Sequence, residues 1–251
     1  MRKKLIFFGI FTTLIATAQK RPSDLKTNKF FTKNGTKMLW GGKNENQHFN
    51  IDNLNLKPSQ FHYGLGREAF PALTKPEFES IEQADKNWTN NSRFLVAKKG
   101  KEVKAYAIQD LIRHEVVNDF IDGEPVFAVY CILADLGAIY KRKYADKIFT
   151  FAVSGYTYYD PKVWNGLDGF ILWDRETESL WWPLIDKAVS GNLKGVNLQK
   201  LENTYWEDTT WKKIKQNYPN AKILKSGQDF KRPTSWKSYE DVSKIVKLYS
   251  Q

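Results

Sequence analysis

Residues 114–131 read HEVVNDFIDGEPVFAVYC and contain a strong signal for a β-hairpin. Asp122 and Gly123 form a two-residue turn motif, because glycine accepts the positive φ that a type I′ turn requires. A turn at that point pairs residue 121 with 124, 116 with 129 and 114 with 131. Directly opposite residues share a face of the sheet, with Cβ atoms roughly 4.5–5.5 Å apart. The stretch therefore predicts that the side chains of His114 and Cys131 face each other.

The predicted pair of His114 and Cys131 suggests two kinds of chemistry. Cys131 is the only cysteine, and the chain has three histidines. An imidazole beside a thiol can hold it as a nucleophilic thiolate and serve as its base, which makes a cysteine-nucleophile enzyme one hypothesis. One nitrogen and one sulfur are also half of a copper or zinc site. The alternative is a buried, inert cysteine, since free cysteine is among the most buried residue types.

Two polar neighbours of His114 are assigned to opposite faces of the strand. Successive side chains of a strand alternate between faces, so Glu115 is expected to point away from the His114–Cys131 pair. Asn118 shares the side of His114 and is a candidate ligand-binding residue.

The first 18 residues predict a secretory signal peptide. Three cationic residues at positions 2–4 precede an apolar run over 5–15 and an Ala-Thr-Ala cleavage motif at 16–18. The apolar run is shorter than the roughly 20 residues that span a bilayer, and no later segment is apolar enough to do so. We therefore expect an exported protein, periplasmic or extracellular, with no membrane span.

Charge and cysteine content restrict the partners of an exported chain. The formal net charge is +11, or +8 without the three cations of the signal segment (11 − 3), and the remaining cations are scattered along the sequence. Export argues against nucleic acid as a target. The single cysteine rules out an internal disulfide. A small molecule, a metal or a glycan remains as the candidate ligand.

The chain is predicted to form one α+β domain over 61–251, preceded by a polar N-terminal arm over 19–60. Strands predominate, and the two best helix predictions, 207–218 and 238–249, lie near the C-terminus. Because helices follow the strands rather than alternate with them, we expect a predominantly antiparallel or mixed β-sheet with a few helices, mainly C-terminal.

Residues 155–169 read GYTYYDPKVWNGLDG and are interpreted as an aromatic loop. Long loops in compact domains are often functional. Tyr158, Tyr159 and Trp164 are therefore candidates for contacting a glycan or a protein, which gives a third hypothesis, a non-catalytic binding module. The alternative is a loop whose rings cover the sheet.

Eight motifs follow one another between residues 67 and 224: REAFPALTKPEF (67–78), KAYAI (104–108), HEVVND (114–119), VYCIL (129–133), FAVSG (151–155), WDRETESLW (173–181), AVSGNLKG (188–195) and TTWKKIKQNYPNAKIL (209–224). In this order they resemble the exported bacterial family called domain of unknown function 3179, which has no established reaction. The resemblance covers most of the chain after the signal segment. The positions that match it are His114, Glu115, Asn118, Cys131, Ser154, Asp174, Arg175, Glu178 and Trp181.

The chain departs from the family pattern where a site is expected. Family members typically read Tyr-Cys-Pro-Leu-Cys, and Ala134 stands here in place of the second cysteine. The resemblance thus implies a divergent member whose site is altered or lost. Asp174, Arg175 and Glu178 are interpreted as a structural clamp, or else Arg175 binds an anionic ligand.

The leading hypothesis is a ligand- or transition-metal-binding envelope protein that uses a pocket at His114 and Cys131. Copper and zinc are the candidate metals. Asn118, Ser154, Asp174, Arg175, Glu178, Trp181, Tyr158 and Trp164 are the candidate ligand-binding residues.

Overall fold

The structure is a computed structural model that describes residues 29–202, 205–228, 238–239 and 241–250. The expected signal peptide lies outside the described residues. Strands dominate, and all named strand pairs are antiparallel except β19 with β7. This confirms the α+β class with a predominantly antiparallel, mixed β-sheet architecture.

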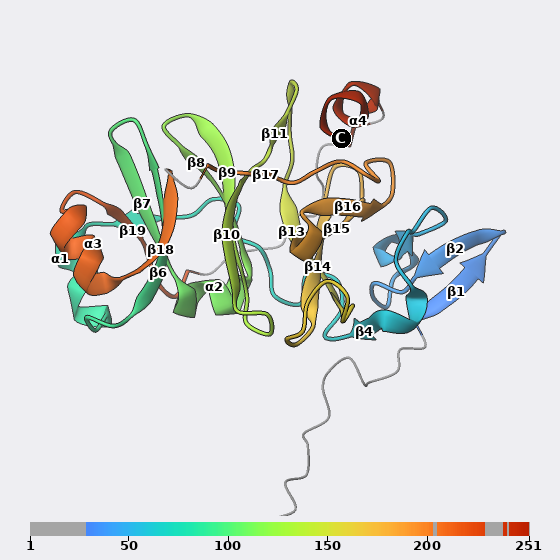
Figure 1. The fold of residues 1–251 in the computed structure, drawn as a ribbon, viewed down its shortest axis with the longest axis horizontal. Coiled ribbons are helices and arrows are strands. Elements are labelled where there is room, and N and C mark those ends of the chain that lie inside the picture. The colour runs from blue at the N-terminus through green and yellow to red at the C-terminus, as the bar shows by residue number, and fades with distance from the viewer. Residues whose placement is uncertain (1–28, 203–204, 229–237, 240, 251) are drawn as a thin grey trace, which may run out of the picture.

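Three sheets follow one another along the long axis of the molecule (Figure 1). The end sheet has the order β18-β6-β7-β19-β5, the middle sheet β17-β10-β9-β8, and the tryptophan sheet β16-β15-β14-β13-β4. The end sheet comprises β5 (Phe78–Glu79), β6 (Arg93–Lys99), β7 (Glu102–Ala107), β18 (Trp206–Thr210) and β19 (Lys222–Leu224). The middle sheet comprises β8 (Val116–Ile121), β9 (Glu124–Cys131), β10 (Leu136–Lys141) and β17 (Gln199–Lys200). The tryptophan sheet comprises β4 (Phe61–Tyr63), β13 (Phe151–Tyr158), β14 (Gly169–Asp174), β15 (Leu180–Trp182) and β16 (Lys187–Ser190).

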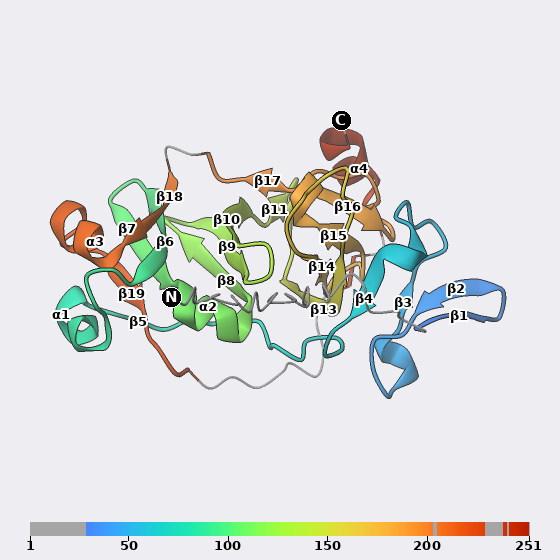
Figure 2. The same cartoon turned by 60° about the horizontal axis from the view of Figure 1, so that its bottom comes forward.

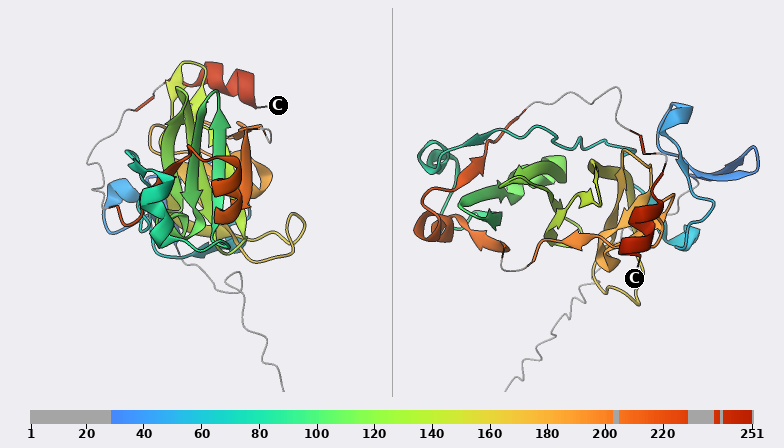
Figure 3. Two further views of the ribbon diagram at one scale, coloured as in Figure 1. Left: turned by 90° about the vertical axis from the view of Figure 1, so that its left-hand side faces the viewer. Right: turned by 90° about the horizontal axis from the view of Figure 1, so that it is seen from above.

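Two smaller sheets and short helices complete the described fold. The strands are β1 (Phe30–Lys33), β2 (Thr36–Leu39) and β3 (Phe49–Asn50), and the hairpin of β11 (Lys143–Tyr144) with β12 (Lys147–Ile148). The helices are α1 (Ile81–Ala84), α2 (Ile108–His114), α3 (Trp211–Asn217) and α4 (Ser243–Tyr249), with 3₁₀ turns η2 (Glu45–Gln47), η3 (Pro58–Gln60), η4 (Asp85–Asn87) and η5 (Pro183–Ile185). Helices α1 and α3 lie at one end of the molecule and β1–β2 at the other, as the right-hand view of Figure 3 shows. None of the helices in the described part of the chain is long and apolar enough to cross a membrane.

The middle sheet buries both of its faces, which explains the long apolar run of its hairpin. Val116 and Phe127 belong to a core shared with the tryptophan sheet. Val117 and Ala128 belong to a core shared with the end sheet. Because successive residues alternate between faces, a strand covered on both sides is apolar at nearly every position.

The expected polar arm is folded over its described part. Strands β1–β3 form a small sheet, and Leu39, Phe49 and Ile51 are buried in the core of the tryptophan sheet. The polar composition of this segment reflects the outer face of its strands, since three of the four residues of β1 and Lys37 of β2 are exposed.

Both C-terminal helices are shorter than expected. Residues 206–210 form β18, which pairs with β6 at the edge of the end sheet, so α3 begins only at Trp211. Trp211 and Ile214 are the buried residues of this helix. Helix α4 begins at Ser243, and its buried residue is Ile245.

Candidate ligand pocket beside Cys131

The central hairpin has the predicted register, but it does not bring His114 opposite Cys131. Ile121 pairs with Glu124 and Val116 with Val129, as the Asp122-Gly123 turn indicates. Strand β8 begins at Val116, however, because α2 continues through His114. Cys131 pairs instead with Leu136 of β10. The predicted cross-strand pair of His114 and Cys131 is therefore wrong.

The reversal at Glu115 separates His114 from Cys131. Glu115 ends α2 in the left-handed conformation, with φ of 57°. Because of this turn, His114 and Glu115 are not consecutive strand residues. Their side chains therefore do not alternate between the two faces of the sheet. Nδ1 of His114 lies 3.1 Å from the carbonyl oxygen of Pro71, and burial lowers the pKa of His114. Glu115, which was expected to point elsewhere, is the residue that lines a pocket together with Cys131.

This pocket has a volume of about 390 Å³ and lies between the middle and tryptophan sheets. The pocket is at the end of the two sheets near α2 and β4. Figure 2 turns this end of the molecule toward the viewer. Its walls come from the end of α2, the β9–β10 turn, the segment after β4 and the strands β13 and β14. The lining residues are Gly64, Leu65, Gly66, Phe70, Ile112, Glu115, Cys131, Ile132, Leu133, Val153, Gly155, Tyr156, Thr157 and Phe170. Glu115 is the one acidic residue among them, and no basic residue is present.

Glu115 has no partner for its carboxyl group. Within the described residues it makes no side-chain hydrogen bond or ion pair, and burial alone raises the pKa of Glu115 to about 7. An ionised carboxylate in an apolar wall is costly unless a cation or several donors meet it. At neutral pH this group is therefore divided between its protonated and charged forms.

Cys131 is buried and only 2% exposed. Burial raises the pKa of Cys131 to about 11, against the lowering effect of hydrogen bonds from the backbone of Ala134 and Phe170. The thiolate is the nucleophilic form of cysteine. With this pKa, with no imidazole beside it, and with Glu115 adding negative charge nearby, the thiol of Cys131 lacks the activation that a nucleophile needs.

The floor of the pocket depends on a close approach of two glycines. Gly155 has φ of +84° at a β-bulge in β13, and a Cβ on it would lie 2.1 Å from the carbonyl group of Gly66. Ser154 stabilises this bulge: its hydroxyl donates to the carbonyl of Ile171 at 2.6 Å and accepts from the amide of Tyr156 at 3.2 Å. Ser154 therefore shapes the pocket from outside and does not line it.

Asn118 connects the middle and tryptophan sheets. Its amide nitrogen donates to the carbonyl of Phe151 at 2.8 Å, and its Oδ1 accepts from the amide of the same residue at 2.9 Å. Asn118 is fully buried and does not line the pocket. It has the geometry of a structural bridge.

Two of the sequence motifs meet through two ion pairs, one buried and one partly exposed. Arg175 donates two hydrogen bonds of 2.8 Å to the carboxylate of Glu68, and both side chains are buried. Arg67 donates to Glu178 at 2.7 Å, and its guanidinium lies 3.6 Å from the ring centroid of Trp173. The residues interpreted as a clamp thus hold segment 67–68 against the β14–β15 turn.

Asp174 ends β14, and Trp181 lies in the adjacent strand β15. The indole nitrogen of Trp181 donates to Asp174 at 2.8 Å, and Asp174 also accepts from the backbone and hydroxyl of Thr177. Burial raises the pKa of Asp174 to about 6. These contacts lie within the β14–β15 hairpin, and neither residue lines the pocket.

The aromatic loop is shorter and less exposed than expected. Residues 155–158 extend β13, and Tyr158 is buried with its hydroxyl 3.0 Å from Gln60. Trp164 is partly buried and packs beside Gly166. Because Tyr158 faces the core, it is not available to an external glycan.

A buried pair that the sequence reading missed lies next to the pocket. Nδ1 of His62 is 2.8 Å from Asp168, and both side chains are buried. The hydroxyl of Thr157, a pocket residue, donates to the same carboxylate oxygen at 2.8 Å. His62 and Thr157 are cross-strand partners in β4 and β13. Asp168 lies about 100 residues from His62 in sequence, so no local spacing marks the pair.

Within the residues that the structure describes, no group of three or more His, Cys, Asp or Glu side chains is arranged to hold a metal ion. The two candidate ligands that share the pocket are Cys131 and Glu115, and His114 is not among its lining residues. Protein sites for zinc supply three or four ligands.

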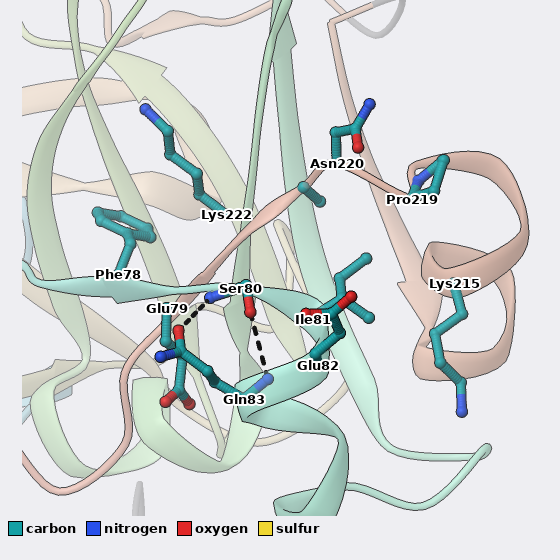
Figure 4. A pocket seen from close by; sticks show the side chains of 11 residues that line it. Phe78, Glu79, Ser80, Ile81, Glu82, Gln83, Lys215, Pro219, Asn220 and Lys222 are labelled. Carbon is teal, nitrogen blue, oxygen red and sulfur yellow. Dashed lines mark hydrogen bonds between the residues drawn. The ribbon is translucent and has the colours of Figure 1, made fainter.

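A larger cavity of about 740 Å³ lies at the edge of the end sheet, between β5, α1 and the end of α3 (Figure 4). Ser80 and Gln83 exchange hydrogen bonds across its wall as the cap of α1. Two of its charged residues are paired: Lys215 contacts Asp85, and Lys222 contacts Glu102. Four charged residues line this groove, whereas Glu115 alone among the acids and bases lines the pocket beside Cys131.

The fold and the pocket define a mainly β-sheet α+β protein with one apolar, acid-bearing cavity between two sheets. The family model described as Protein of unknown function (DUF3179) matches residues 67–249, and the chain belongs to this family. No match was found among the curated proteins or among the solved structures.

Proposed function

We propose that this protein binds a small, largely apolar molecule in the pocket beside Cys131. The observation that supports this most is the composition of the pocket, about 390 Å³ lined by apolar side chains and backbone with a single unpaired carboxyl group. Small-molecule sites typically have volumes of about 300–1,000 Å³, apolar walls and few polar groups. The pocket beside Cys131 has all three properties.

The entrance of the pocket also suits an apolar ligand. Leu65 and Ile132 line it and are 63% and 53% exposed. Large aliphatic side chains at a rim are stabilised when a bound molecule covers them. A ligand that fills the pocket and extends over this rim would remove both from water.

The other hypotheses have weaker support. A cysteine-nucleophile enzyme lacks an activating base at Cys131, whose pKa burial raises. Copper or zinc binding would have to use Cys131 and Glu115 with ligands from outside the protein, since the described residues provide no third. A glycan-binding role for the aromatic loop has less support because one of its candidate residues, Tyr158, is buried. Export to the periplasm or the extracellular space, inferred from residues 1–18, remains part of the proposal.

Titration with a neutral fluorescent probe, N-phenyl-1-naphthylamine, tests the proposal. We expect saturable binding of one probe per chain and a loss of at least about tenfold in affinity for Ile132→Asp, because a carboxylate at the rim must be desolvated. Leu248→Asp is the matched control, since Leu248 is 52% exposed on α4 and does not line the pocket. Equal affinity in both variants, or no saturable binding, contradicts the proposal.

A further inference from the structure

We infer that the ligand is a cationic amphiphile, with a protonated amine that pairs with the carboxylate of Glu115 and an apolar body that occupies the rest of the pocket. This inference rests on the proposed function and names the chemical class of the ligand. It comes from the charge, the position and the surroundings of Glu115.

Charge balance favours a cation. No basic side chain lines the pocket, and no described charge or hydrogen-bond donor meets the Glu115 carboxyl group. Buried carboxylates in proteins are normally paired, as Glu68 is with Arg175. A ligand ammonium group would supply the missing partner and donate a charge-assisted hydrogen bond in a site with little water.

The same arrangement disfavours an anion, although the chain is basic overall. A net charge of +11 attracts anions to the surface as a whole. Inside the pocket, the ionised Glu115 would repel a carboxylate or phosphate, and no cation is there to receive it. The local charge therefore selects against the ligands that the overall charge attracts.

The position of Glu115 sets the orientation of the ligand. Glu115 lies at the end of α2, whereas the exposed apolar residues Leu65 and Ile132 form the rim. Phe70, Phe170 and Ile112 provide further apolar wall. A molecule with its amine at Glu115 would place its apolar part against these walls and over the rim.

Competition by three eight-carbon compounds tests the inference. Octylamine, octan-1-ol and octanoate are titrated against the bound naphthylamine probe at pH 8, where Glu115 is mostly ionised and a primary amine is protonated. We expect octylamine to bind about 10- to 100-fold more tightly than octan-1-ol, and octanoate to bind most weakly. In Glu115→Gln the ratio of the amine affinity to the alcohol affinity should fall to about one.

A pH series on the unmodified protein gives a second readout that does not depend on a variant. Protonation of Glu115 at pH 5.5 removes the negative charge, so the preference for octylamine over octan-1-ol should shrink by about tenfold or more. Equal binding of amine and alcohol at pH 8, with the probe still bound, overturns the inference but leaves the proposed function intact. Absence of probe binding contradicts the proposed function and the inference together.

Discussion

Glu115 and Cys131 line the same pocket although one ends a helix and the other ends a strand. Burial raises the pKa of both groups, and the charge of Glu115 raises the pKa of Cys131 further. At neutral pH the thiol is protonated and the acid is only partly ionised, so the pocket holds at most one negative charge. A pocket with apolar walls and a single acid is expected to prefer apolar and cationic molecules.

The thiol of Cys131 should react slowly with iodoacetamide in the folded protein. Burial raises its pKa to about 11, compared with about 8.5 for a free cysteine, so the thiolate fraction at pH 8 falls by about 200-fold. We expect labelling at pH 8, followed by mass spectrometry, to be at least about 100-fold slower than in urea. Rapid labelling of the folded protein at pH 7 would instead support a cysteine nucleophile.

The stability of the protein should carry a pH-dependent contribution from Glu115. Its pKa is raised from 4.5 to about 7 on folding, so the folded state binds the proton more tightly than the unfolded chain. The contribution of Glu115 to the free energy of unfolding is therefore most favourable below pH 4.5, falls as the pH rises to about 7, and is constant above that. The fall is at most about 3 kcal/mol.

Urea unfolding between pH 4 and pH 8 measures this effect. Glu115→Gln should gain stability relative to the unmodified protein as the pH rises through this window, and the exposed Glu82→Gln should not. A difference between the two variants that does not change with pH would show that Glu115 is solvated in the folded protein.

The hairpin and the pocket differ in how well the sequence predicts them. The register of β8 with β9 follows from Asp122-Gly123, because a two-residue turn determines strand pairing locally. The position of His114 depends on a single left-handed residue, Glu115, which ends α2 one residue before the strand. Nothing in the composition of residues 108–115 distinguishes that ending from a strand that begins at His114.

The long-range contacts of the site could not be predicted from local sequence patterns either. The bulge at Gly155 and the segment at Gly66 approach each other because two distant strands are packed together. Arg175 and Glu68, 107 residues apart, carry no spacing signal. Arg175 forms an ion-paired clamp, but its partner is Glu68 and not the neighbouring Asp174 or Glu178. Tyr158 was expected outside and is buried by the extension of β13.

The ion pair of Arg175 with Glu68 should matter for stability and not for ligand affinity. Arg175→Met breaks this buried ion pair, and such a change typically costs about 3–5 kcal/mol in the free energy of unfolding. The double variant Arg175→Met, Glu68→Leu should recover part of this loss, because both charges of the pair are then replaced by apolar side chains. Lys99→Met, which breaks a half-exposed pair with Glu124, should cost at most about 1 kcal/mol. Normal stability with lost probe binding would assign Arg175 to the ligand instead.

Two glycine substitutions separate backbone strain from steric conflict at the pocket floor. Gly123 and Gly155 both have positive φ, but a Cβ has free space at Gly123 and meets the backbone of Gly66 at Gly155. Gly123→Ala should therefore lose about 1–2 kcal/mol of stability and keep full probe affinity. Gly155→Ala should lose more stability and bind the probe less tightly. If the two variants lost the same stability and had the same probe affinity, the close approach of Gly155 to Gly66 would be relaxed in solution.

The most direct test of the account is where an apolar molecule binds. In a protein with isotope-labelled isoleucine methyl groups, the account predicts that the naphthylamine probe shifts the resonances of Ile112 and Ile132, which line the pocket beside Cys131. The resonance of Ile81, which lines the larger cavity at the edge of the end sheet, should stay unchanged. Saturable shifts at Ile81 with none at Ile112 and Ile132 would contradict the central claim.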